Sequence, residues 1–123
     1  AVATTVAHDS HNAIVVGTND EDMLVALEAL QSMQGGLVVV EDGQVIGEMP
    51  LPVAGIMTDV EARVAAQQLH KVHEALHRIH PHLQFHFFLT LSFLSLPVIP
   101  TLKLTDTGLF DVTNFKHIEI EAL

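Results

Sequence analysis

The chain has 123 residues, a formal net charge of −10 and no cysteine, and 49% of its residues are hydrophobic. Its five basic residues are scattered, which argues against nucleic acid or an anionic membrane as a partner, because both are bound by grouped Lys and Arg. The most apolar stretch, residues 87–100, is shorter than the ~20 residues that span a bilayer. Without cysteine the chain has no disulfide, thiolate metal site or thiol nucleophile, and it is compatible with the cytoplasm.

The high apolar fraction has two interpretations at this stage. A compact core with few charges explains it, and so does a surface that another domain or subunit covers. The sequence alone favours neither.

The first third of the chain predicts two short strands and a helix. The strands are expected at residues 2–6 and 13–16, which are rich in aliphatic and β-branched side chains. Thr18 and Glu21 have the spacing of a capping box, in which each side chain satisfies a free amide at a helix start. We therefore expect a helix at 19–34, ended by Gly35 in the left-handed conformation.

A hairpin and a second helix follow. Asp42-Gly43 is a strong signal for a two-residue hairpin turn, and it lies between apolar segments at residues 37–41 and 44–49. Thr58 and Glu61 form a second capping pattern. Apolar residues then recur at helical spacing, so the second helix is expected at 59–79, with Pro81 closing it.

The last third is less regular. Residues 89–96 are continuously apolar and predict a buried strand, residues 105–112 predict turns or a short helix, and residues 117–121 predict a final strand. We expect a single layered domain over residues 1–123, of α/β class with α+β as the alternative. Its mixed sheet of about six strands would pack with two main helices, and it is not a TIM barrel.

Nine histidines raise the question of a metal site. Four of them lie at spacings of three, four and three on the second predicted helix: His70, His73, His77 and His80. Imidazoles from one helix cannot close a tetrahedron around an ion without a ligand from another element. We expect a polar stripe that binds metal adventitiously at most, and no physiological metal site in this chain.

The densest polar segment runs from His8 to Asn12, between the first two predicted strands. Asp9, Ser10 and Asn12 are typical of turns that side chains stabilise by bonding to the backbone. The alternative is a binding role for His8, Asp9, Ser10, His11 and Asn12, either near a substrate or at an interdomain contact. Neighbours in one loop do not form a catalytic triad, so no catalytic residue is predicted here.

Three blocks of the sequence carry a family resemblance. They read VAHDSHN and IVVGTND at residues 6–12 and 14–20, LPVAGIM at 51–57, and LTLSFL, LPVIP, LKLTD and GLFDV within 89–112. In this order they resemble the C-terminal domain of bacterial adenine deaminases, over nearly the whole chain. The helix with the histidine stripe matches least.

The resemblance implies a parent enzyme of the amidohydrolase superfamily that hydrolyses adenine to hypoxanthine and ammonia in purine salvage. It also implies a catalytic (β/α)8 barrel that carries binuclear manganese or iron, and no cofactor in this chain. The domain would cover that barrel or support a homo-oligomer, and it would be inactive alone. A free-standing small-ligand or metal-binding module is the alternative.

Overall fold

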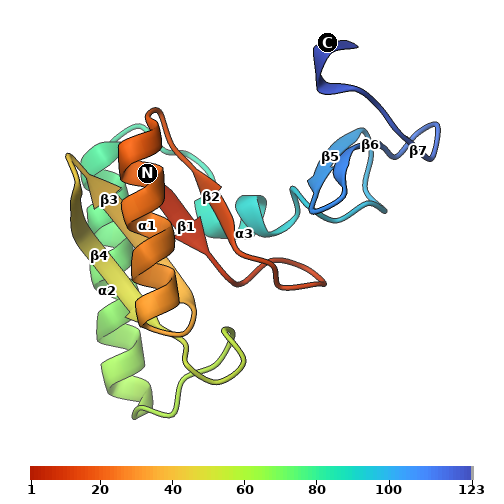
Figure 1. Ribbon diagram of the computed structural model, residues 1–123. Coiled ribbons are helices and arrows are strands. Elements are labelled where there is room, and N and C mark those ends of the chain that lie inside the picture. Colours follow the sequence, from red (N-terminus) through yellow and green to blue (C-terminus); the bar gives the residue numbers. More distant parts are fainter. Residues whose placement is uncertain (123) are drawn as a thin grey trace.

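The computed structural model describes residues 1–122 and shows two regions, which we call the body (residues 1–92) and the arm (residues 93–122) (Figure 1). The body contains β1 (Val2–Thr4), β2 (Ile14–Val16), α1 (Asp20–Ser32), β3 (Gly36–Glu41), β4 (Gln44–Pro50), α2 (Ala62–Ile79) and α3 (Phe87–Ser92). The arm contains β5 (Leu102–Thr105), β6 (Gly108–Asp111), β7 (Lys116–His117) and a 3-10 turn at Ile120–Ala122.

The body sheet has the strand order β2-β1-β3-β4, and each strand is antiparallel to its neighbours. β2 and β3 therefore run in the same direction with β1 between them, and α1 is the crossover that joins them. The prediction of a small α/β domain with two main helices and no barrel is confirmed. Instead of one mixed sheet, residues 1–122 contain two sheets, and both are antiparallel. In the body sheet, β2 and β3 run in the same direction but do not pair, because β1 lies between them.

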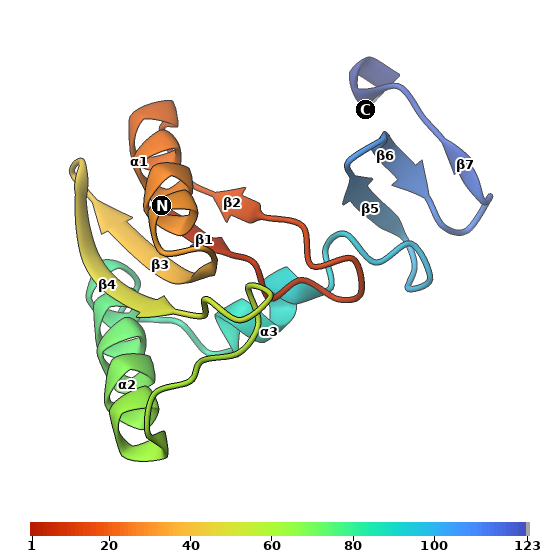
Figure 2. The ribbon, with the colours of Figure 1, turned by 60° about the horizontal axis from the view of Figure 1, so that its bottom comes forward.

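The core of the body consists of two layers on opposite faces of the sheet (Figure 2). Val38 and Val40 of β3 pack with Ala26 and Leu30 of α1. On the other face, β3 packs through its alternate residues against α2 and Leu91 of α3. A strand buried on both faces needs a continuous apolar run, and each fully buried valine contributes about 1.5–3 kcal/mol.

The hairpin is confirmed, with β3 and β4 flanking the predicted turn. Asp42 and Gly43 have φ values of 51° and 73°, as the predicted primed turn requires. The two N-terminal strands are also confirmed as β1 and β2, each shorter than predicted.

Both capping patterns were assigned to the wrong residues. α1 is capped by Asn19, whose side chain accepts a hydrogen bond of 2.8 Å from the backbone N–H of Asp22, so Thr18 lies outside the helix. α2 begins at Ala62, three residues later than predicted, and Glu61 caps it without a side-chain hydrogen bond. The hydroxyl of Thr58 instead accepts a hydrogen bond of 3.4 Å from the N–H of Val60, within a local turn.

The strand predicted at residues 89–96 is wrong, because this segment begins in α3 and continues as turns. The backbone bonds within α3 are local, as between the N–H of Thr90 and the carbonyl of His86 (2.9 Å). Within residues 1–122, only single long-range bonds reach the segment, to the carbonyls of Ser92 and Leu94, and they do not form a strand ladder. Leu91 is buried while Leu89 is 58% exposed. An uninterrupted apolar run does not by itself distinguish a helix from a strand.

The prediction of turns or a short helix at residues 105–112 is also wrong. Most of this segment lies in the hairpin β5–β6, in which Leu104 pairs with Leu109. The hydroxyl of Thr105 donates to the carbonyl of Gly108 (2.8 Å) and stabilises the turn. Of the last predicted strand, residues 117–121, only His117 lies in a strand, as the second residue of β7, and Ile120 and Glu121 lie in the 3-10 turn.

The arm sheet, in the order β5-β6-β7, stands apart from the body sheet in both ribbon views (Figures 1 and 2). One face carries Phe110, which packs edge-on against Phe115 and His117 at centroid distances of 5.3 and 5.1 Å. The alternation of β5 and its register with β6 place three leucines on the opposite face, which we call the leucine face: Leu102, Leu104 and Leu109.

Candidate functional site

The polar loop of residues 8–12 connects β1 to β2 and extends from the body toward the arm (Figures 1 and 2). All five residues are exposed. The backbone holds the loop in place. The N–H of His11 donates to the carbonyl of Ala7 (2.7 Å), and the N–H of His8 donates to the carbonyl of Ser92 (2.8 Å).

The side chains of the loop are much less engaged than its backbone. The imidazole of His8 stacks on the ring of Phe93, with centroids 5.8 Å apart and an interplanar angle of 22°. Within residues 1–122, no side chain of the loop makes a hydrogen bond. The expected side-chain bonds of Asp9, Ser10 and Asn12 to the turn are therefore missing from this region, and the polar groups face outward.

The fold brings the three resemblance blocks together at this loop. His8 of the first block contacts Ser92 and Phe93 of the third. His11 of the first block and Gly55 of the second line one shallow cavity of about 370 Å³. Segments far apart in the sequence thus meet around the polar loop.

Thr5 fixes the contact between the first two blocks, and sequence reasoning missed it. Its hydroxyl donates to the carbonyl of Gly55 (2.6 Å) and accepts from the N–H of Gly36 (2.8 Å). One side chain therefore joins the start of the loop, the start of β3 and the segment after β4. A single threonine in a strand-like stretch carries no sequence signal for such a role.

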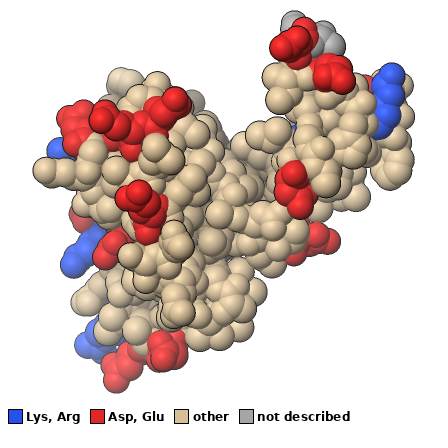
Figure 3. All heavy atoms as spheres, in the orientation of Figure 1, with Lys and Arg blue, Asp and Glu red and all other residues tan. Residues whose placement is uncertain are grey.

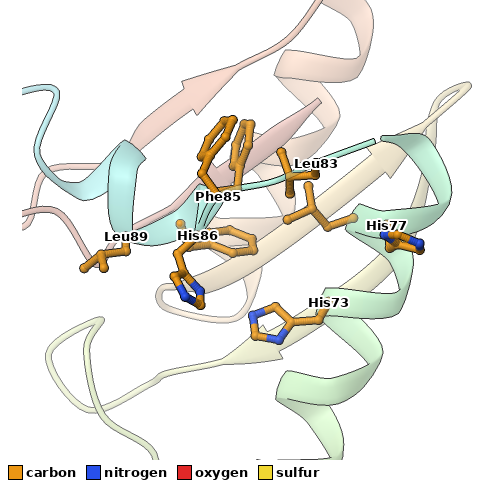
Figure 4. Close-up of a pocket in the computed structure, with 9 residues that line it drawn as sticks. His73, His77, Leu83, Phe85, His86 and Leu89 are labelled. Atoms are coloured by element: carbon orange, nitrogen blue, oxygen red, sulfur yellow. The ribbon is translucent and has the colours of Figure 1, made fainter. Parts of the chain in front are cut away.

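A second cavity, of about 440 Å³, lies between α2 and the segment that leads into α3 (Figure 4). The rings of His73 and His86 extend into the same space, while His77 lies farther along α2. Phe85, Phe87 and several leucines supply the remaining walls, and no Lys, Arg, Asp or Glu lines the cavity. Imidazoles among aromatic rings can contact an uncharged, flat molecule by hydrogen bonding and stacking.

The histidine stripe does not assemble into a metal site. His70 lies 3.3 Å from the carboxylate of Glu74, whereas His73 and His77 line the cavity beside α3 and His80 lines a different one. In the part of the chain that the structure describes, no three His, Asp or Glu residues gather around a common point. The residues of this region do not fit the binuclear metal site that the resemblance implies, and no step through such ions follows from them.

The carboxylate of Asp22 has a structural role. Asp22, near the start of α1, accepts hydrogen bonds from the N–H of Gly43 (2.7 Å) and from the side-chain amide of Asn19 (3.2 Å). The Gly43 hydrogen bond, followed by that of Asn19, holds the pKa of Asp22 below its usual value. This carboxylate joins α1 to the hairpin turn, far along the body from the polar loop.

Figure 3 shows acidic side chains gathered over one end of the body. Further acidic groups lie on the arm and beside the region where the arm meets the body, and most of the remaining surface between the two regions in this view is uncharged. No helix among residues 1–122 is both long enough and apolar enough to cross a membrane.

Comparison with known proteins places these features in a family. The family model described as the adenine deaminase C-terminal domain matches residues 1–116. The chain is 66% identical to an adenine deaminase of Lysinibacillus sphaericus over 122 residues, which is 99% of this chain and 21% of that protein. It is 54% identical over 99% of its length to one of Bacillus pumilus, and 50% identical over 98% to one of Bacillus subtilis. These alignments also cover 21% of each relative. The chain belongs to the family of adenine deaminase C-terminal domains.

Proposed function

We propose that this chain is the accessory domain of an enzyme that hydrolyses adenine to hypoxanthine and ammonia, in purine salvage in the cytoplasm. The family match and the names of the relatives support the activity. The catalytic part would be an amidohydrolase barrel in the remaining four-fifths of the protein. Manganese or iron held there would supply Lewis-acid chemistry. The accessory domain would cover the barrel and support a homo-oligomer.

Within this enzyme, the polar loop would contact the entrance of the active site or the purine itself. The observation that carries this proposal is that the three resemblance blocks meet at a loop whose polar side chains make no hydrogen bond within residues 1–122. Adenine is an uncharged, flat molecule with several hydrogen-bond donors and acceptors. His8 and His11 carry complementary groups on a backbone that is already fixed.

The test is alanine substitution in the full-length enzyme. We expect His8→Ala or His11→Ala to lower kcat/KM by at least about 10-fold, equivalent to ~1.4 kcal/mol of transition-state stabilisation, because a positioning group acts by orienting the substrate. Metal content and Tm should change little. His82→Ala removes another exposed histidine, one outside the polar loop, and should leave kcat/KM unchanged.

Two results would contradict the role of the loop. Full activity in both histidine variants would leave the loop a connector only, and activity that falls only together with Tm would show a folding defect. Asp9→Ala and Asn12→Ala should have smaller effects, since neither removes an aromatic ring. The 123-residue chain alone should release no ammonia from adenine above a buffer control, even with added manganese or ferrous iron.

A further inference from the structure

The leucine face of the arm sheet is an apolar surface without a partner in the described part of the chain. Leu104 is 60% exposed and Leu102 is 38% exposed. Val98 and Ile99, in the segment that leads into β5, are 68% and 41% exposed. An antiparallel sheet of this kind normally buries one apolar face against another layer. Exposed aliphatic residues gathered in one region mark an interaction surface.

The small size of the arm sheet also indicates that it packs against a further layer. Its three strands contain four, four and two residues, and the body sheet is a separate sheet with its own two helix layers. The aromatic face is partly covered by the packing of Phe110, Phe115 and His117. On the leucine face Leu102 and Leu104 stay exposed, Leu109 is half-buried, and Asp111, which pairs with Leu102, adds one carboxylate at the edge. A sheet this small depends on packing against another layer for its stability.

We infer that the leucine face is the surface on which the part of the parent enzyme outside this domain docks. This inference rests on the proposed function. The relatives are about five times longer than this chain, so four-fifths of such a protein lies outside the structure. The polar loop extends from the body toward the arm and stacks on Phe93 at its start, so a domain seated at the loop lies beside the arm as well.

A covalently linked domain is favoured over a second copy of the chain as the occupant. Linkage raises its effective concentration at the arm to the millimolar range, well above that of a separate protein molecule. The docked domain would bury Leu102, Leu104 and Leu109, and it would leave Lys103, on the opposite face of β5, in solvent.

Thiol labelling of the full-length enzyme tests this assignment. The 123 residues contain no cysteine, so Leu104→Cys and Lys103→Cys each introduce the only thiol of this domain, and mass spectrometry of the tryptic peptide reads the labelling. In the domain by itself, position 104 is the more exposed of the two. We expect the order to be reversed in the native enzyme, with Leu104→Cys labelled by a maleimide at least about 10-fold more slowly than Lys103→Cys. Both should react equally after unfolding in guanidinium.

Leu102→Cys is a second reporter on the same face if Leu104→Cys does not fold. Equal labelling, or faster labelling at position 104 or 102 than at 103, would overturn the proposal. The measurement is repeated on monomers obtained by dilution and checked by size-exclusion chromatography. Protection that persists in the monomer supports docking within one chain, and protection lost there would assign the face to a second copy. Adenine turnover by the unmodified enzyme is measured in parallel, so that failure of the proposed activity is seen separately from failure of the docking assignment.

Discussion

In the body, the valines of β3 lie between α1 on one side and α2 with α3 on the other, whereas in the arm the leucines of β5 face outward. Both segments are apolar strands in antiparallel hairpins, and their different burial comes from their neighbours. The body contains the helices that cover its sheet. The arm contains no helix layer within the described residues, and Leu102 and Leu104 of its leucine face stay exposed there.

The sharpest test of this comparison uses one glycine in each region. A Cβ at Gly36 (φ 148°) would overlap the carbonyl oxygen of Met49, whereas a Cβ at Gly108 (φ 124°) would have its nearest neighbour 3.8 Å away. We expect Gly36→Ala to destabilise the body by about 3 kcal/mol or more, through combined backbone strain and overlap. Gly108→Ala should cost about 1–2 kcal/mol, locally, from strain alone. Urea unfolding followed by circular dichroism measures the first effect, and hydrogen exchange in residues 102–111 measures the second.

Leucine truncation gives the next largest difference. Leu76 is 4% exposed in the core beside β3, and Leu76→Ala should cost about 3 kcal/mol in the 123-residue chain. Leu104→Ala should stay within about 0.5 kcal/mol there, because its side chain lies mostly in solvent. In the full-length enzyme we expect the Leu104→Ala cost to rise while the Leu76→Ala cost stays the same. A Leu104→Ala cost that is already large in the short chain would mean that the arm is packed without a partner.

Acid titration gives the smallest expected difference. The pKa of Asp22 is lowered mainly by the N–H of Gly43, and that of Asp111 mainly by the side-chain amide of Asn114. A carboxylate with a lowered pKa stabilises the folded state fully above its ordinary pKa, about 3.9, and this stabilisation is lost as pH falls through the lowered value. Asp22→Asn should therefore be less stable than wild type at pH 7 and should approach it below about pH 4.

Asp111→Asn is the matched change in the arm. It should shift global unfolding less than Asp22→Asn, because Asp22 joins α1 to the body hairpin and Asp111 holds only a local turn through Asn114. Thermal melts across this pH range measure both variants. A constant gap between wild type and Asp22→Asn down to pH 2 would show that the charge of Asp22 is not the source of its effect.

The body was predictable from its sequence because its signals are local. The Asp42-Gly43 turn and the apolar run of β3 define a hairpin without reference to the rest of the chain. The helical spacing of apolar residues correctly predicted α2, but the predicted start was three residues too early. The order of the strands was not predictable, because the insertion of β1 between β2 and β3 depends on long-range packing.

The arm and the surroundings of the candidate site were beyond sequence reasoning for a related reason. Residues 89–96 satisfy the apolar pattern of both a helix and a strand, so the pattern alone could not decide between them. The polar loop stood out by its run of hydrogen-bonding residues. Its distant neighbours did not, because Ser92 and Phe93 reach the loop, and Gly55 reaches Thr5 beside it, only through the tertiary fold.

The path of the polar loop is set by its backbone, which determines how freely its side chains can change in evolution. The backbone bonds from His11 to Ala7 and from His8 to Ser92 set its path, and neither uses a side chain. Substitutions at Asp9, Ser10 or Asn12 therefore change the chemistry that the loop presents without removing a bond that determines its shape. The side chains of this surface can change one at a time at little cost in stability, while the backbone beneath them keeps its path.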